Sequence, residues 1–169
     1  MPSGPLAASI PDLEITVARE GERPTLANLF QLYIHDFSEL IPDRPEFELG
    51  PDGRFRDYPL DAYWSGTAHV PLLMRVSGRL VGFALLDQAS RTGQPVDRNM
   101  REFFIARTHR RKGVGTAAAQ ALFSRYPGRW ETAVARSNTP ALSFWRRAIR
   151  QHANARDERR RSVPPRVYG

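Results

Sequence analysis

The chain has 169 residues, no cysteine and a formal net charge of +7. This length predicts one domain with a buried core, and the lack of cysteine excludes disulfide-stapled folds and thiol nucleophiles. No apolar run reaches the roughly 20 residues needed to span a bilayer, and residues 1–14 lack the pattern of a signal peptide. We therefore expect a cytoplasmic protein without a membrane partner.

The charge is unevenly distributed along the chain. Residues 1–97 hold 8 basic and 14 acidic residues, a balance of −6, whereas residues 98–169 hold 17 and 4, a balance of +13. Such asymmetry suggests a polyanionic ligand for the second part, and both nucleic acid and a phosphate-rich cofactor fit it.

The predicted elements begin after a Pro- and Ser-rich leader, residues 1–11, that we expect to be disordered. Residues 13–18 show an alternating pattern and include β-branched side chains, which predicts a strand. Apolar residues at helical spacing predict a helix over residues 25–40. Residues 41–67 hold several prolines and aromatics without a sustained period, and loops of this length within a domain are usually functional.

The second half alternates between strands and helices. Residues 69–76 and 79–87 flank Ser77-Gly78 and predict a hairpin. Strands are predicted at residues 100–106 and 130–135, with a helix at 113–126 between them. A last helix begins after Asn138, with Pro140 in its first turn, and ends near Ile149. The remaining residues, 151–169, form a basic tail with little apolar periodicity.

This order predicts an α/β (α+β) domain. The hairpin favours antiparallel pairing, and the strand–helix–strand unit over residues 100–135 favours parallel pairing. Together they predict a mixed sheet with helices on its faces.

The stretch RRKGVGT, Arg110 to Thr116, has the composition of an anion site. Gly113 and Gly115 would let backbone amides approach a ligand, and a helix N-terminus offers free N–H donors and partial positive charge. The alternative is a glycine turn beside solvated cations. A P-loop is excluded because G-x-x-x-x-G-K-[ST] is missing, and a Rossmann fingerprint because its third glycine position holds Ala118.

This stretch resembles the R/Q-x-x-G-x-G/A signature of the GNAT N-acetyltransferase superfamily. The longer segment FFIARTHRRKGVGTAAAQALF is similar to that superfamily's strand, loop and helix, and NTPALSFW is similar to a segment of its following helix. The resemblance covers about residues 13–150 and is greatest to a bacterial subgroup. It implies a mostly antiparallel twisted sheet, with acetyl-CoA bound where two parallel central strands splay apart.

The resemblance also implies which residues contact acetyl-CoA. The pyrophosphate would lie on the backbone amides of residues 111–116, and the pantetheine arm would pair with the strand edge at residues 103–105, near residues 133–135. The full implied set is Phe103, Phe104, Ile105, Arg110, Arg111, Lys112, Gly113, Val114, Gly115, Thr116, Asn138 and Trp145. No residue spacing suggests a metal site.

The implied reaction is direct transfer of the acetyl group to a primary amine of a small molecule or protein. The amine must lose a proton to attack, and an N–H at a strand bulge would polarise the thioester carbonyl. Glu102 and Glu131 are the candidate bases, although each could be an exposed strand carboxylate paired with arginine.

Trp145 stands where the superfamily usually has a tyrosine that protonates the departing thiolate. Tyr33, Tyr168 or water could supply this proton instead, or no acid is needed, because the thiol pKa of about 8.5 makes the thiolate a tolerable leaving group. Trp145 is otherwise expected to pack.

Three functions remain open from the sequence. The first is an acetyl-CoA-dependent N-acetyltransferase, whose acidic first part could attract a cationic amine such as a polyamine or aminoglycoside. The second is a non-catalytic CoA-binding module. The third is a nucleic-acid-binding protein, which the lack of a reader motif disfavours. A homodimer is left open.

Overall fold

The computed structural model describes residues 10–41 and 44–152 of the chain. Within them, five strands form one sheet in the order β1-β2-β3-β4-β5. The strands are β1 Leu13–Val17, β2 Val70–Val76, β3 Arg79–Asp87, β4 Arg98–Ile105 and β5 Trp130–Thr132, and the main helices are α1 Arg23–Leu40, α2 Val114–Arg125 and α3 Thr139–Gln151. The predicted leader and tail lie mostly outside the described residues.

All strand pairs are antiparallel except β4 and β5, which run parallel. The turn between β2 and β3 has positive φ at Ser77 and Gly78, as expected for a two-residue hairpin loop. The predicted mixed, mostly antiparallel sheet flanked by helices is therefore confirmed.

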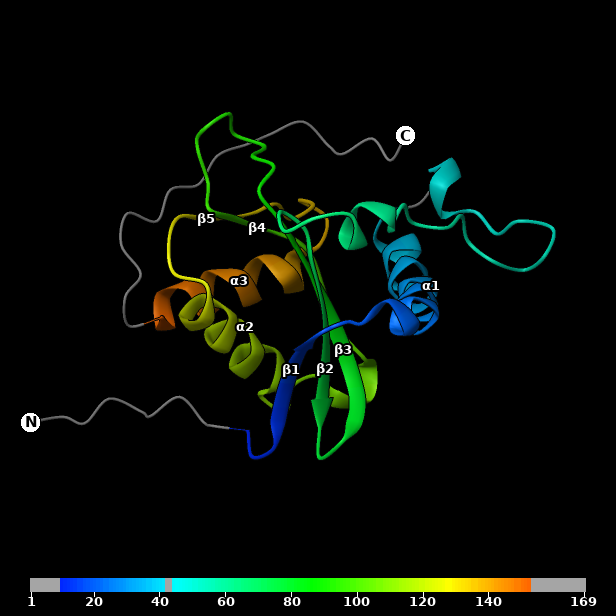
Figure 1. Cartoon of the computed structure of the whole chain (residues 1–169). Coiled ribbons are helices and arrows are strands. Elements are labelled where there is room, and N and C mark those ends of the chain that lie inside the picture. The colour runs from blue at the N-terminus through cyan, green and yellow to red at the C-terminus, as the bar shows by residue number, and fades with distance from the viewer. Residues whose placement is uncertain (1–9, 42–43, 153–169) are drawn as a thin grey trace, which may run out of the picture.

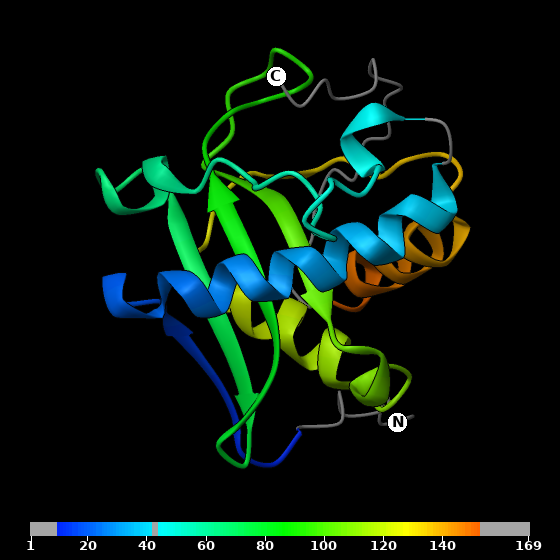
Figure 2. The ribbon, with the colours of Figure 1, turned by 90° about the vertical axis from the view of Figure 1, so that its right-hand side faces the viewer.

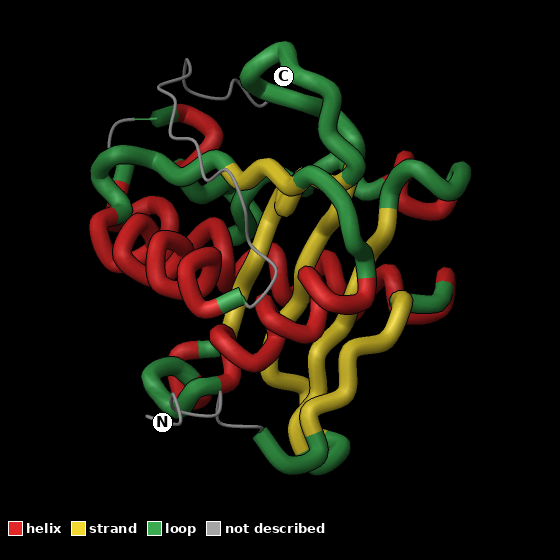
Figure 3. Tube along the Cα trace, turned by 90° about the vertical axis from the view of Figure 1, so that its left-hand side faces the viewer, coloured by secondary structure: helices red, strands yellow, loops and turns green. Residues whose placement is uncertain are grey.

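The helices cover the two faces of the sheet. Figure 2 shows α1 lying across one face, and Figure 3 shows α2 and α3 on the other. Because side chains alternate along a strand, Leu73 and Phe83 pack with Phe30 of α1, whereas Leu72 and Ala84 pack with the α2 and α3 side. The sheet lies between α1 and the pair α2 and α3 (Figure 1) and thus separates two apolar cores.

Several element boundaries differ from the prediction, among them the start of β4, which lies at Arg98 and not at residue 100. The helix predicted from Thr25 begins at Arg23, because Pro24 fits the first turn, where its missing N–H costs no hydrogen bond. The strand predicted over residues 130–135 ends at Thr132. Its apolar residues Ala133 and Val134 instead continue as a segment without strand pairing.

The described residues of the long segment after α1, 41 and 44–67, are mostly irregular, as predicted, with short 3-10 turns at Pro45–Phe47 and Asp61–Trp64. The segment buries Phe55, Leu60 and Tyr63 in the core beneath α1. This segment is therefore folded against α1.

Candidate active site

A cavity of about 1330 Å³ opens where β4 and β5 separate. The two strands pair only from Arg98–Met100 to Trp130–Thr132. Beyond this point β4 continues to Ile105, whereas the chain after Thr132 leaves the sheet, so that residues 103–105 and 133–135 line the cavity from opposite sides. Other parts of its wall come from α1 on one face of the sheet and from α2 and α3 on the other.

The N-terminus of α2 forms one end of the cavity. Gly113 has φ +82° and caps the helix in the left-handed conformation, which glycine adopts without strain. The backbone N–H groups of the first turn have no acceptor within the helix. Gly113, Gly115 and Thr116 line the cavity, and a Cβ added at Gly115 would lie 3.3 Å from the Phe144 ring. These residues fit a pyrophosphate held by backbone donors.

The side chains of this loop that were predicted to contact acetyl-CoA lie in different surroundings. Arg111 lines the cavity and is exposed, and Lys112 is exposed outside the lining. Val114 is buried in the core. Arg110 lines the cavity, but its Nε donates to the Ile105 carbonyl at 2.6 Å and its guanidinium is bonded to Asp36.

The strand and the last helix supply an aromatic wall. Phe103 stacks on Phe144 with ring centroids 5.8 Å apart. Trp145 is 7% exposed and packs edge-on against Phe103 at 5.1 Å, which is the packing position expected of it. Asn138 also lines the cavity, and its Oδ1 accepts the Ala141 N–H at 3.1 Å as the cap of α3.

A bulge in β4 decides where Glu102 points. Leu85 of β3 pairs with Glu102 and Leu86 with Met100, which leaves Arg101 as an extra residue. An extra residue moves the side chains that follow it to the opposite face of the sheet. Met100 therefore packs with the α2 side, whereas Glu102, two residues later, faces α1.

The Glu102 carboxylate is held by two phenols in the cavity wall beneath α1. It is 3% exposed. Its two oxygens accept hydrogen bonds from the hydroxyls of Tyr33, at 2.6 Å, and Tyr58, at 3.2 Å. Both Glu102 and Tyr33 line the cavity, so a carboxylate and a phenol face the same space.

Glu131 lies outside the cavity lining and binds the loop after β3. It accepts hydrogen bonds from Ser90 Oγ at 3.0 Å, Arg91 N at 2.5 Å and Thr92 Oγ1 at 2.9 Å. Burial would raise the pKa of Glu131, but these hydrogen bonds outweigh it and hold the pKa below its usual range. The two predicted carboxylates are therefore not brought together.

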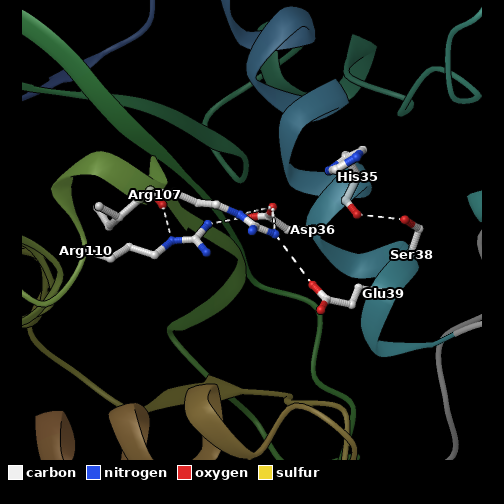
Figure 4. A network of polar contacts seen from close by, with 7 residues as sticks. His35, Asp36, Ser38, Glu39, Arg107 and Arg110 are labelled. Carbon is white, nitrogen blue, oxygen red and sulfur yellow. Dashed lines mark hydrogen bonds and ion pairs between the residues drawn. The ribbon is translucent and has the colours of Figure 1, made fainter.

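An ion-pair bridge joins α1 to the loop between β4 and α2. Arg107 bonds to Asp36 at 2.8 Å and reaches Glu39 at 3.6 Å, and Arg110 bonds to the other Asp36 oxygen. Figure 4 shows the two guanidinium groups converging on Asp36. Burial would raise the pKa of Asp36, but its bonds to Arg110 and Arg107 hold the pKa below its usual range.

Sequence reasoning missed two of these contacts. Tyr58 lies 44 residues from Glu102, in a segment without periodicity. Asp36 and Arg110 are 74 residues apart, and no local pattern marks them as partners. Tyr33 was an open candidate for the acid, and Tyr168 lies outside the described residues.

Two negative findings apply to residues 10–41 and 44–152. No group of three or more His, Asp and Glu side chains there is arranged to hold a metal ion. No helix in this part of the chain is long and apolar enough to cross a membrane.

The fold resembles solved N-acetyltransferases at low sequence identity. An aminoglycoside acetyltransferase from an uncultured soil metagenomic sample, in complex with sisomicin, is 14% identical with a TM-score of 0.57 over 92% of this chain and 97% of that one. A ribosomal-protein-alanine N-acetyltransferase from Brucella melitensis biovar Abortus 2308 is 15% identical, with a TM-score of 0.55 over 92% and 99%.

A third solved structure contains CoA. This aminoglycoside N-acetyltransferase in complex with CoA is 15% identical, with a TM-score of 0.57 over 91% of this chain and 98% of that one. No curated protein sequence matches significantly. The model of the Acetyltransferase (GNAT) family matches residues 26–149. The chain therefore belongs to the GNAT acetyltransferase family.

Proposed function

We propose that this protein transfers the acetyl group of acetyl-CoA to a primary amine. The observation that carries the proposal is one continuous cavity with the glycine-containing N-terminus of α2 at one end and a buried carboxylate, Glu102, on the α1 side. Family membership and the CoA complex of a structural neighbour support the cofactor.

The cofactor would enter from the α2 and α3 side. The amides of Gly115 and Thr116 would hold its pyrophosphate, and the β4 edge at residues 103–105 would bind its pantetheine arm, because this edge is left without a partner strand once β5 ends. The aromatic wall of Phe103, Phe144 and Trp145 would exclude water. When bound, the cofactor supplies an activated acetyl thioester.

The α1 side would handle the amine. Glu102 would accept the proton that the amine must lose to become a nucleophile. Tyr33 and Tyr58 hold this carboxylate in one orientation through its two oxygens. A base already held in the reactive orientation lowers the entropic cost of reaching the transition state. The Arg101 bulge would present a backbone N–H to the thioester carbonyl oxygen.

The test combines binding and turnover on the full chain. Calorimetric titration should show that folded protein binds acetyl-CoA at submillimolar concentration. Thiol release over a panel of primary amines should then exceed the rate without protein, with the acetylated amine identified by mass. Folded protein that fails to bind acetyl-CoA would refute the proposal. Binding without turnover on any amine would favour the non-catalytic module instead.

A further inference from the structure

The α1 end of the cavity, where the acceptor would bind, is mainly apolar. The apolar and aromatic residues that line it lie on α1 or on the segment that follows, and they are Tyr33, Phe37, Leu40, Ile41 and Phe47, beside the charged Asp36, Glu39 and Arg44. Phe37 lies between two other rings, with centroids 4.9 Å from Tyr33 and 6.1 Å from Phe47. This end therefore offers ring faces and aliphatic carbon.

The described carboxylates of α1 that line this end of the cavity are paired with arginines. Asp36 and Glu39 line the same end of the cavity, and both are paired with Arg107, while Arg110 also binds Asp36. Two carboxylates thus face two guanidinium groups. The acidic composition of the first part of the chain does not produce a surplus of negative charge here.

A second small pocket adjoins this end. It has a volume of about 40 Å³ and lies between α1 and the segment after it, with Phe37, Phe47 and Tyr58 among its walls. Tyr33, Phe37 and Phe47 border both spaces. The small pocket and the cavity therefore share an aromatic wall.

From these contacts we infer that the acceptor is a monoamine on an apolar or aromatic carrier, not a polycation. This inference rests on the proposed function. One amine would face Glu102 while its carrier packs against Phe37 and Phe47. A second ammonium group packed against these rings would lose water, and the described carboxylates of α1 at this end already have arginine partners, so placing it there is costly.

The experiment compares acceptors of equal length in the acetyl-CoA-dependent thiol-release assay. Hexylamine and hexamethylenediamine share a six-carbon chain and differ by one amine. We expect kcat/KM for hexylamine, and for phenethylamine, to exceed that for hexamethylenediamine, spermidine and an aminoglycoside by about tenfold or more, since an ammonium group that loses water without a carboxylate partner is strongly disfavoured.

A pair of variants ties the preference to this end of the cavity. Phe47→Asp adds an unpaired carboxylate and should reduce the hexylamine preference several-fold, whereas Phe47→Leu should retain it. Acetyl-CoA affinity should stay the same in both, which shows that they are folded.

The outcomes separate the inference from the function beneath it. Preference for the diamine, spermidine or the aminoglycoside by wild-type protein would overturn the inference while leaving acetyl transfer intact. An unchanged preference in Phe47→Asp would overturn the assigned location. Failure to bind acetyl-CoA would overturn the proposed function as well.

Discussion

At the α2 end of the cavity the groups proposed to bind the ligand are mainly backbone, whereas at the α1 end they are side chains. Gly113, Gly115 and Thr116 lie within four consecutive residues of the sequence and need only a helix start to act together. Glu102, Tyr33 and Tyr58 come from three separate segments and meet only through tertiary packing. A site made of consecutive amides can be recognised from a short motif, but one assembled from distant side chains cannot.

Glu102→Gln should have the largest effect, because it removes the proposed base and keeps the size of the side chain. We expect kcat to fall by about 100- to 10,000-fold, the usual range for losing a general base. Acetyl-CoA affinity should not change, since Glu102 lies away from the α2 end. Steady-state kinetics measures kcat, and calorimetry measures acetyl-CoA affinity separately. A kcat close to that of wild type would remove Glu102 from the mechanism.

Thr116→Glu should damage the other end of the cavity. Thr116 is the third residue of α2, where an acidic side chain stabilises a helix, so the variant should fold. The same charge would repel a pyrophosphate, and we expect acetyl-CoA affinity to fall on the order of 100-fold. Thr116→Gln is the matched neutral control and should bind nearly as wild type does. Equal binding by the two variants would place the phosphates elsewhere.

Glu131→Gln distinguishes the two carboxylates predicted from the sequence. Because Glu131 holds the loop at residues 90–92, we expect a loss of about 1 to 3 kcal/mol of unfolding free energy, with kcat nearly unchanged. A large drop in kcat without a change in stability would instead support Glu131 as the base.

The stability difference should also depend on pH. The pKa of Glu131 is lower in the folded protein than its ordinary value of 4.5. Its contribution is therefore complete above 4.5 and is lost as the pH falls through the lowered folded value. The melting temperatures of wild type and Glu131→Gln should therefore converge as the pH is lowered. A difference in melting temperature that grew instead would contradict the lowered pKa of Glu131.

Trp145→Phe should have the smallest effect. The indole packs edge-on against both Phe103 and Phe144, so a smaller ring should cost stability by roughly 1 kcal/mol and change kcat by about threefold at most. Loss of most activity with an intact fold would mean that Trp145 does more than pack.

The parts of the fold that follow local patterns were predictable. The α2 start, the α3 cap at Asn138 and the hairpin at Ser77-Gly78 each depend on a few neighbouring residues. The early end of β5 was not predictable, since Ala133 and Val134 fit a strand pattern yet leave the sheet.

The facing of Glu102 was equally hidden from the sequence. The bulge at Arg101 switches the side chains that follow it to the other face of the sheet. An alternating apolar pattern in the sequence does not reveal such an inserted residue. The bond between Asp36 and Arg110 depends on how α1 crosses the sheet, which no local pattern records.

The central claim is that the first turn of α2 holds the acetyl-CoA pyrophosphate through backbone N–H groups. Backbone amide NMR signals of Gly115 and Thr116, followed during titration with acetyl-CoA, test it most directly. We predict that these two amides shift strongly and exchange more slowly with solvent as the cofactor binds. Saturable acetyl-CoA binding that leaves both amides unshifted and unprotected would contradict the account.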